Sequence, residues 1–426
     1  MRLQESGMKK IFIIGGGLSG LAAAGSLAEK SEVTILEKAG FLGGLAGSFS
    51  QDNEWIPFHY HHVVSHNSFT IKYLERFGLM EGCEWKKVNV AIGVNGKLYN
   101  INNPFGLLKF DYLNYYERIR FGFFGAYALF LMNPNKINEN QDAKTWLNKY
   151  AGKKVTDKVF YNLYARNKFN IDLDKISAKQ FAHRLKEREV YDSFTFPKKG
   201  LQTMIDGLEK ELIKKGVKIL LKANIEEIDF DKKEIKFNGE IHSFDIIINS
   251  IPIPEFLKFS KGIPEDYSKQ VSRVKYCPCV GIAFATKELL DKNNYWINLF
   301  QEDVHVIMQH SWLIDKYKNK ITWCLRYGGS EEDLKLTEYQ IREKYFKVIK
   351  KYFPESEILW SKVFREKYAE PIYDKEFSDY KPDYITPVNG LYMTGIQVTH
   401  PKIRNMNSAL LSGEEISRII LEREFQ

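Results

Sequence analysis

The chain has 426 residues, of which 44% are hydrophobic and 27% are charged, and its formal net charge is +8. This length exceeds one ordinary hydrophobic core and predicts two domains of a folded protein, which excludes a small single module and a disordered chain. Lysine-rich helical stretches such as 209–215 are typical of a solvated face, and no alternation of aromatic and basic residues indicates nucleic-acid binding, so the positive balance favours anionic substrates or membrane surfaces.

The first element is a strand, a glycine-rich turn and a helix, in the stretch MKKIFIIGGGLSGLAAAGSLA. A β-branched and aromatic run at Ile11–Ile14 predicts the strand, and an apolar helical pattern over Leu18–Ala28 predicts the helix. Gly15 permits a sharp turn, Gly17 lets a pyrophosphate approach the backbone, and Gly20 lets the helix pack closely on the strand. The phosphates then meet the free amides of the helix N-terminus, so the spacing indicates a dinucleotide-binding turn.

A secretory signal peptide is the alternative interpretation, because the stretch has basic residues, an apolar run and small residues. A cleaved leader has no use for three spaced glycines and a following acid, so we interpret the stretch as part of the folded protein. Residues 1–7, MRLQESG, precede a native start expected at Met8, and we expect them to be an added leader.

Two features downstream extend the predicted cofactor site. A second strand is predicted over Glu32–Leu36, and Glu37 follows it, 17 residues after Gly20. An acidic side chain at this place can accept the ribose hydroxyls of an adenine dinucleotide. The next segment, KAGFLGGLAGSF, contains the pair Gly43 and Gly44, which either passes its backbone beside a second phosphate or ribityl chain or is an ordinary glycine-rich loop.

A histidine cluster follows in the segment FHYHHVVSHNS, where His59, His61, His62 and His66 are four of the nine histidines. On a strand, the first two share one face and the last two the other. A metal site needs three or four converging ligands, and no acidic or cysteine cluster stands nearby, so we expect no metal. The cluster is either an aromatic-rich strand beside the cofactor or a functional group there.

The longest apolar run, FGFFGAYALFLM at 121–132, is too short to span a bilayer, which needs about 20 apolar residues. We expect a buried core helix here. The alternative is a surface helix or the wall of a lipophilic tunnel, with Arg118 and Arg120 facing lipid headgroups, which would make 118–132 a peripheral membrane contact.

The middle of the chain mixes helices and strands. Amphipathic helices are predicted in DAKTWLNKYAG and SAKQFAHRLKER, after a polar break at 132–144. Farther along, strands are predicted at Val280–Ala285 and Ile321–Tyr327, and a helix is predicted near Glu338–Tyr352. The four cysteines have no metal-ligand spacing and are expected to be free thiols of a cytoplasmic protein.

The C-terminal stretch NGLYMTGIQVTHPKIRNMNSALLSGEEISRII predicts a strand at Leu391–Thr394, a glycine at Gly395, a loop, and a small-residue helix from about Asn407. Such an ending can bring a strand and a second helix N-terminus back to the cofactor. The alternative, a C-terminal helix with a preceding strand and no ligand, leaves the glycine and the loop RNMNS unexplained.

Taken together, these motifs resemble the FAD-containing amine oxidase superfamily over essentially the whole chain, closest to its protoporphyrinogen oxidase-like and phytoene desaturase-like branch. The segments FPKKGLQTMIDGLEKELIKKGVKILLKANIEEIDF, SFDIIINSIP, NNYWINL and REKYAEPIY also resemble that branch. UDP-galactopyranose mutase is a more distant similarity, based on its histidine-containing loop.

The resemblance implies an α/β fold in which a Rossmann-like, GR2-type FAD-binding domain is interleaved with an α+β substrate domain. The expected FAD-binding domain comprises 8–90, 195–260 and 388–426, and the substrate domain comprises 91–194 and 261–387. FAD is expected to bind noncovalently, because no cysteine lies in the C-terminal flavin-facing motif. The implied cofactor contacts are Gly15, Gly17, Leu18, Ser19, Gly20, Glu37, Lys38, Gly43, Gly44, Leu45, Ala46, Ile225, Gly395, Arg404, Asn405, Met406 and Asn407.

Three residues, His61, His62 and Arg326, are candidates for catalysis, and Arg404 is a candidate for cofactor or substrate binding. In this superfamily the segment after the Gly-Gly pair passes close to the flavin ring, so the resemblance implies that His61 or His62 bonds to flavin or substrate, or accepts a proton. Arg326 lies on an apolar strand, where an unpaired charge is costly, so we expect a partner for it from the protein or the substrate. Arg404 either neutralises a reduced flavin, contacts a substrate phosphate or forms a surface salt bridge.

The function that we expect is an FAD-dependent oxidoreductase of the desaturase or oxidase type, in which hydride passes from a ring or isoprenoid-like small molecule to the flavin. The first alternative is a flavin-dependent mutase acting on a nucleotide-linked or lipid-linked sugar. The second is a prenyl-binding or lipid-binding protein that resembles the Rab GDP-dissociation inhibitors. We expect a cytoplasmic protein, peripheral to the inner membrane surface if 118–132 is exposed, and no nucleic-acid partner.

Overall fold

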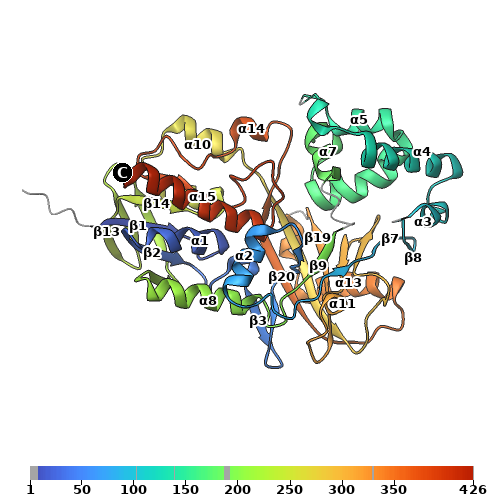
Figure 1. Cartoon of the computed structure of the whole chain (residues 1–426), viewed down its shortest axis with the longest axis horizontal. Coiled ribbons are helices and arrows are strands. Elements are labelled where there is room, and N and C mark those ends of the chain that lie inside the picture. Colours follow the sequence, from blue (N-terminus) through green and yellow to red (C-terminus); the bar gives the residue numbers. More distant parts are fainter. Residues whose placement is uncertain (1–7, 102, 139, 187–191, 329–330, 426) are drawn as a thin grey trace, which may run out of the picture.

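A parallel sheet organises the half of the molecule that contains the N-terminal motif (Figure 1). The computed structural model describes residues 8–425 except 102, 139, 187–191 and 329–330, so the expected leader at 1–7 lies outside the described residues. Five parallel strands follow the order β10 (Lys218–Leu221), β2 (Ser31–Glu37), β1 (Lys9–Ile14), β14 (Ile246–Asn249) and β21 (Leu391–Met393).

Alternate side chains of β1 face two different cores. Ile11 and Ile13 belong to the core formed with the helices, whereas Phe12 and Ile14 belong to the core on the opposite face. The helices are α1 (Leu18–Leu27), α8 (Leu201–Lys214) and α15 (Met406–Glu424). The opposite core includes residues of β11 (Ile225–Asp229) and β12 (Glu234–Phe237), which form an antiparallel sheet with β13 (Glu240–Ser243), and of α9 (Ile253–Leu257) and α10 (Glu265–Ser272). Because both faces are covered, β1 reads as an uninterrupted apolar run.

Helices α1 and α15 pack against each other without room for a side chain at Gly413. A Cβ atom there would collide with the carbonyl oxygen of Ser19 and lie 2.6 Å from the Cβ of Ala22. The neighbouring Ser412 Oγ lies 3.4 Å from Ser19 Oγ. This contact between the first and the last helix places both N-termini beside the same cavity.

A second sheet of seven strands forms the other half of the molecule. Its order is β20 (Ile358–Pro371), β16 (Tyr276–Thr286), β19 (Lys320–Tyr327), β18 (Val306–Met308), β17 (Trp296–Leu299), β7 (Val90–Val94) and β8 (Lys97–Tyr99). Only β17 and β7 pair in parallel within this sheet. One face packs on α13 (Glu338–Tyr352), whose bounds are those that the sequence predicted. The described chain also forms α11 (His310–Leu313), α12 (Glu331–Lys335), α14 (Phe377–Tyr380) and the small strands β3 (Ser48–Gln51), β4 (Glu54–Pro57), β5 (Val63–Val64), β6 (Lys86–Lys87), β9 (Ser193–Thr195) and β15 (Ser260–Lys261).

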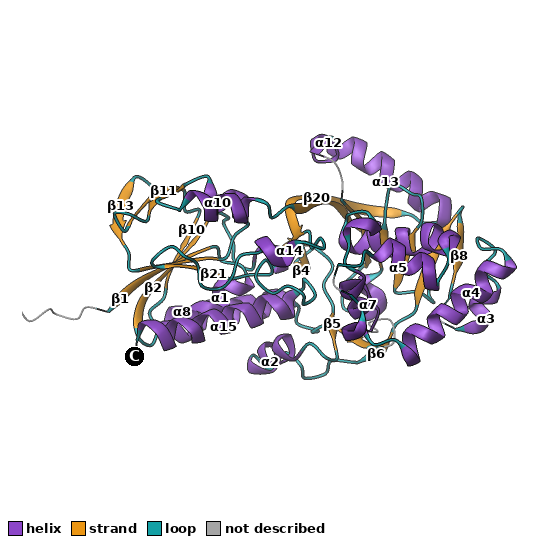
Figure 2. Ribbon diagram, turned by 90° about the horizontal axis from the view of Figure 1, so that it is seen from above, coloured by secondary structure: helices purple, strands orange, loops and turns teal. Residues whose placement is uncertain are grey.

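A layer of helices lies beside this sheet, and Figure 2 shows it from above. It comprises α3 (Pro104–Leu108), α4 (Tyr115–Ala126), the π-helical turn Tyr127–Leu131, α5 (Ala143–Tyr150), α6 (Lys153–Val155), the π-helical segment Thr156–Phe169 and α7 (Ala178–Lys186). Helix α2 (Ser68–Arg76) lies apart from it and packs on α15. The helices share one apolar core that includes Trp146, Phe160 and Phe181.

The expectation that 121–132 is a buried core helix is wrong for most of its length. Phe124 and Met132 are buried, but Phe123, Phe130 and Leu131 are exposed. The segment is a surface helix, because only one narrow stripe of α4 meets the helical core. No helix in the described part of the chain has the length and apolar character needed to cross a bilayer.

Candidate active site

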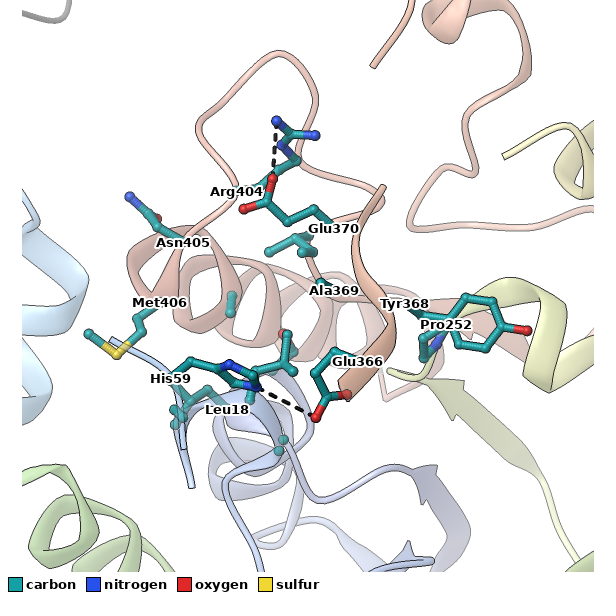
Figure 3. Close-up of a pocket in the computed structure, with 18 of the residues that line it drawn as sticks. Leu18, His59, Pro252, Glu366, Tyr368, Ala369, Glu370, Arg404, Asn405 and Met406 are labelled. Atoms are coloured by element: carbon teal, nitrogen blue, oxygen red, sulfur yellow. Dashed lines mark ion pairs between the residues drawn. The ribbon is translucent and has the colours of Figure 1, made fainter. Parts of the chain in front are cut away.

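One cavity of about 1010 Å³ collects most of the residues that the sequence singled out. It is lined by the N-termini of α1 and α15, the ends of β1 and β2, strand β20 and the end of the π-helical segment. Figure 3 shows part of its wall, with the start of α15 and strand β20 facing each other across the view. Segments from both sheets therefore meet around one space.

The two glycine-rich loops lie side by side at one part of this cavity. Gly43 and Gly44 both have positive φ angles, of 100° and 55°, and the Gly43 amide donates to the Gly16 carbonyl over 2.8 Å. A Cβ atom on Gly44 would lie 3.2 Å from the Cα of Gly17. A Cβ on Gly17 would meet nothing within 4 Å, so open space remains beside the helix N-terminus, where a pyrophosphate can approach the backbone amides.

The Glu37 carboxylate is held at the end of β2 by two backbone amides. Oε2 accepts from the Gly16 amide and Oε1 accepts from the Ala39 amide, each over 2.7 Å, and the side chain is 8% exposed. Each carboxylate oxygen has capacity for a second hydrogen bond. Glu37 lines the cavity, so it is placed to accept the hydroxyl groups of a ribose.

The cavity continues past Glu37 to Lys38 and to the start of β11. The Ala223 amide donates to the Glu37 carbonyl over 2.9 Å, which brings Ala223, Asn224 and Ile225 beside the end of β2. Ile225 is the residue for which the sequence predicted a backbone contact with adenine, and it lines the cavity.

The opposite part of the cavity is built at the start of α15. Gly395 has a φ angle of 97°, and its amide donates to Ser412 Oγ over 3.0 Å, so the end of β21 is fastened to the helix. Asn405 caps α15, because its side chain accepts from the Ser408 amide over 2.9 Å. The remaining free amides of this helix N-terminus, next to Met406, suit the negative charge that a reduced flavin carries.

A dinucleotide cofactor fits this arrangement. The cavity offers two helix N-termini, two glycine loops with open backbone and a buried carboxylate, which are groups that suit a pyrophosphate, a ribose and a flavin. Of the 17 predicted cofactor contacts, the structure places 15 along its wall: Gly15, Gly17, Leu18, Ser19, Glu37, Lys38, Gly43, Gly44, Leu45, Ala46, Ile225, Gly395, Arg404, Asn405 and Met406.

The other two predicted contacts have structural roles. Gly20 faces β1, where a Cβ atom would collide with the Gly15 carbonyl and lie 3.2 Å from Ile13 Cγ2, as its predicted packing role requires. The side-chain oxygen of Asn407 accepts from the amides of Phe69 and Thr70, over 2.8 and 3.2 Å. Asn407 therefore ties the start of α15 to α2 and does not line the cavity.

Arg326, which the sequence singled out as a candidate for catalysis, does not line the cavity. It lies on β19, where successive side chains point to opposite faces, and its neighbour Tyr327 is the one that lines the cavity. The Arg326 guanidinium instead pairs with Asp303 and Asp333, at 3.1 and 3.4 Å. The partner that its apolar strand required is thus supplied by the protein.

Arg404 lines the cavity, but the protein also provides its counter-charge. Its guanidinium forms an ion pair with Glu370 (Figure 3), 3.2 Å from Oε2, and donates to the carbonyl groups of Pro371 and Lys168. It also lies over the Tyr373 ring, with its Cζ 5.0 Å from the ring centroid. Arg404 fastens β20 and the π-helical segment to the loop before α15.

The histidine cluster divides between the cavity and its surroundings. His59, His61 and His62 line the cavity, whereas His66 lies 2.6 Å from Asp192 and does not. His62 Nδ1 is 3.0 Å from the Tyr295 hydroxyl. In the described ranges, no three His, Cys, Asp or Glu side chains are grouped closely enough to hold a metal ion.

Of the three histidines that line the cavity, His61 has the most clearly defined protonation state. Its Nε2 donates to the Leu45 carbonyl over 2.9 Å, and burial lowers its pKa to about 4. At neutral pH the ring is therefore uncharged with its proton on Nε2, and Nδ1 is a hydrogen-bond acceptor.

Strand β20 supplies residues that sequence reasoning missed. Six consecutive residues of it, 365–370, line the cavity, although a regular strand would present every second one. The register with β16 shifts between Cys277 and Cys279, which flank Pro278. Proline cannot donate to a ladder, so the strands bulge here.

The bulge brings two carboxylates into the cavity wall. Glu366 Oε1 lies 3.5 Å from His59 Nε2, and Glu370 pairs with Arg404 (Figure 3). Pro278 within a strand pattern was the one sequence signal that could have found this bulge.

Aromatic side chains line the part of the cavity next to the seven-stranded sheet. The hydroxyl groups of Tyr60 and Tyr327 lie 3.4 Å apart, and Trp296 is covered by the Lys168 ammonium, 4.0 Å from the ring centroid. Burial raises the pKa of Tyr327 well above its usual value, so its hydroxyl stays protonated.

Comparison with known proteins agrees with this geometry. The family described as flavin containing amine oxidoreductase matches residues 18–421. The chain is 22% identical over 479 residues to the 15-cis-phytoene desaturase of Synechococcus elongatus, with 97% of this chain and 96% of that protein covered.

Two solved structures show the same fold. A candidate protoporphyrinogen oxidase from Exiguobacterium sp. 255-15 has a TM-score of 0.79 at 15% identity, covering 98% of this chain and 100% of that chain. Reduced UDP-galactopyranose mutase has a TM-score of 0.77 at 16% identity, covering 98% and 96%. The predicted α/β fold of the FAD-dependent amine oxidase type is confirmed.

Proposed function

The chain belongs to the flavin containing amine oxidoreductase family and is an FAD-dependent oxidoreductase, and from this premise we propose that it desaturates or oxidises a ring or isoprenoid-like small molecule. FAD supplies the acceptor for a hydride taken from carbon when it is bound. The observation that carries the proposal is the aromatic wall next to the predicted flavin end, where His61 is neutral and the hydroxyl of Tyr327 stays protonated.

The chain's own residues have three tasks in this reaction. Glu37 and the two glycine loops hold the cofactor, and the start of α15 places positive partial charge where negative charge develops. Tyr60, Tyr327 and Trp296 give the substrate an aromatic wall and exclude water. His61 Nδ1 is the acceptor that can hold the proton lost from the substrate or bond to a substrate hydroxyl.

The mutase alternative depended on two arginines, Arg404 and Arg326, and the structure does not support that role for either. A sugar diphosphate needs cations that are available to its phosphates. Arg404 pairs with Glu370, and Arg326 pairs with Asp303 and Asp333 outside the cavity. The binding-protein alternative required a fold without its cofactor site, whereas both glycine loops and Glu37 line the cavity here.

We also propose the interleaved division stated above, with 8–90, 195–260 and 388–426 as the FAD-binding domain and 91–194 and 261–387 as the substrate domain. The strand membership of the two large sheets supports it. We propose a cytoplasmic location, where the four free thiols stay reduced.

The experiment is a two-step spectroscopic test on the purified protein. Its visible spectrum is recorded, and the protein is then precipitated so that released flavin can be identified and counted. The holoenzyme is next mixed anaerobically with unsaturated isoprenoid hydrocarbons, with cyclic tetrapyrrole precursors and with UDP-galactopyranose. Bleaching of the flavin by one of the first two classes, with a product carrying one more double bond, is the expected result. Conversion of the sugar nucleotide by the chemically reduced enzyme alone would instead establish the mutase.

A further inference from the structure

The most exposed hydrophobic side chains gather on one helical stretch. In the part of the chain that the structure describes, the five large hydrophobic side chains with the highest exposed fractions are Tyr116 (82%), Phe130 (79%), Leu131 (78%), Phe105 (77%) and Phe123 (73%). The set that we call the apolar tip also includes Leu108, Tyr115 and Ile119. Such a concentration of exposed apolar surface marks an interaction site.

The apolar tip has helical order. Tyr116, Ile119 and Phe123 recur every three or four residues along α4 and so share one face of the helix. An adjacent face of the helix is anchored in the helical layer through buried Phe124. Arg118 binds α3 to α4, because its guanidinium donates to the carbonyl groups of Leu113 and Leu108. The tip therefore cannot turn inward without breaking the core behind it.

The tip lies at one end of the molecule. Figures 1 and 2 both place α3 and α4 at the end opposite to β1 and β13, so a flat surface can approach them without meeting the parallel sheet.

The stretch of sequence that carries the tip has an excess of basic residues. Residues 101–158 contain nine Lys and Arg against five Asp and Glu. Two of the acids are engaged by lysines: Glu117 lies 3.0 Å from Lys158, and Asp111 lies 3.3 Å from Lys97. A stretch with an excess of basic residues that also exposes aromatic and leucine side chains is complementary to an anionic lipid surface, whereas a second copy would bring two positively charged stretches together.

We propose that the apolar tip inserts into the headgroup region of an anionic bilayer and that the enzyme takes a lipophilic substrate from it. The tip and one wall of the cavity belong to the same packed layer, because the Lys186 ammonium at the end of α7 donates to the Leu129 carbonyl over 3.2 Å, and α7 also supplies Gln180 and Arg184 to the cavity. The proposed membrane contact depends only on the exposed residues of the tip. The proposed source of the substrate depends in addition on the proposed function.

The test is flotation of the holoenzyme with vesicles, without any substrate. Vesicles of phosphatidylcholine with about one third phosphatidylglycerol are compared with pure phosphatidylcholine, at low and high salt. The tip variant carries Phe123→Ser, Phe130→Ser and Leu131→Ser. The matched control carries Tyr339→Ser, Ile241→Ser and Ile385→Ser, three exposed hydrophobic residues outside the tip. Flavin content and thermal melting verify that both variants are folded.

The wild type and the control should float with the anionic vesicles, less so at high salt, and the tip variant should bind roughly tenfold more weakly or worse. A wild type that stays at the bottom of the gradient with every vesicle overturns the proposal. So does equal flotation of the tip variant, or light scattering that shows a wild-type dimer which the tip substitutions convert to monomers. Activity on a detergent-dispersed substrate reports on the proposed function separately.

Discussion

At the scale of a single residue, Glu37 connects two parts of the proposed cofactor site. Its carboxylate holds the amides of Gly16 and Ala39, while its backbone carbonyl receives the Ala223 amide. The side chain thus fixes the turn after β1 relative to the end of β2 and keeps capacity for ribose hydroxyl groups.

Glu37→Gln should weaken FAD retention by about tenfold to a hundredfold, because the amide can accept at only one atom and carries no charge. The measurement is flavin per protein after dialysis, with a titration of the apoprotein. Glu32→Gln is the matched control, since Glu32 lies on the same strand and is exposed. Equal flavin content in the two variants would remove Glu37 from the ribose site.

His61→Gln should lower kcat by about a hundredfold with FAD content unchanged, because Nδ1 as an acceptor is lost while the bond to the Leu45 carbonyl can be replaced. His66→Gln is the control, because His66 pairs with Asp192 outside the cavity. If both variants retain full kcat, His61 contributes packing only.

At the scale of elements, the contact between α1 and α15 decides where the cofactor site forms. Both helices begin at the cavity, and the absence of a side chain at Gly413 lets them approach. Pro278 has a comparable effect on β20, since the bulge opposite it turns consecutive residues toward the cavity.

Gly413→Ala should destabilise the fold by about 1–3 kcal/mol and reduce FAD content, because the added methyl group meets the Ser19 carbonyl and Ala22. Gly25→Ala on α1 is the control, where the nearest atom to a Cβ is Leu212 Cδ2 at 3.9 Å. That variant should be neutral or more stable by about 0.5–1 kcal/mol. Thermal and urea unfolding measure both, and similar stabilities would show that the helices can separate at little cost.

At the scale of the whole molecule, several buried or half-buried histidines are uncharged. Burial lowers the pKa of His305 to about 2 and that of His310 to about 3, and it lowers those of His61 and His400 to about 4. The unfolded chain binds protons at these sites near pH 6.5, whereas the folded chain does not. Their stabilising contribution is complete above pH 6.5 and is lost as the pH falls toward the folded values.

The free energy of unfolding should therefore drop between pH 7 and pH 5, with losses of about 2 kcal/mol for each of His305 and His310. Urea midpoints across this range provide the measurement. His310→Phe should flatten the pH dependence more than replacement of exposed His183, whose pKa is also lowered by desolvation. A stability that is constant from pH 7 to pH 5 would contradict the buried neutral state.

The sequence by itself determined those elements of the structure whose conformation depends only on residues close together in the chain. The glycine spacing after β1, the acid at the end of β2 and the helices α1, α13 and α15 were predicted nearly to their bounds, because backbone conformation and apolar periodicity are local properties. The resemblance to the amine oxidase superfamily was likewise carried by these motifs, and the comparisons confirm it.

Only the tertiary structure decided which faces meet. Arg326 turned away from the cavity through the two-residue period of its strand, Asn407 became the cap of α2, and the apolar run before Met132 came to the surface. Glu366 and Glu370 each lie beside a basic partner in the cavity wall, because the strand bulges opposite Pro278. Each outcome depends on packing between segments far apart in the chain, and a one-residue shift in register reverses the face that a side chain presents.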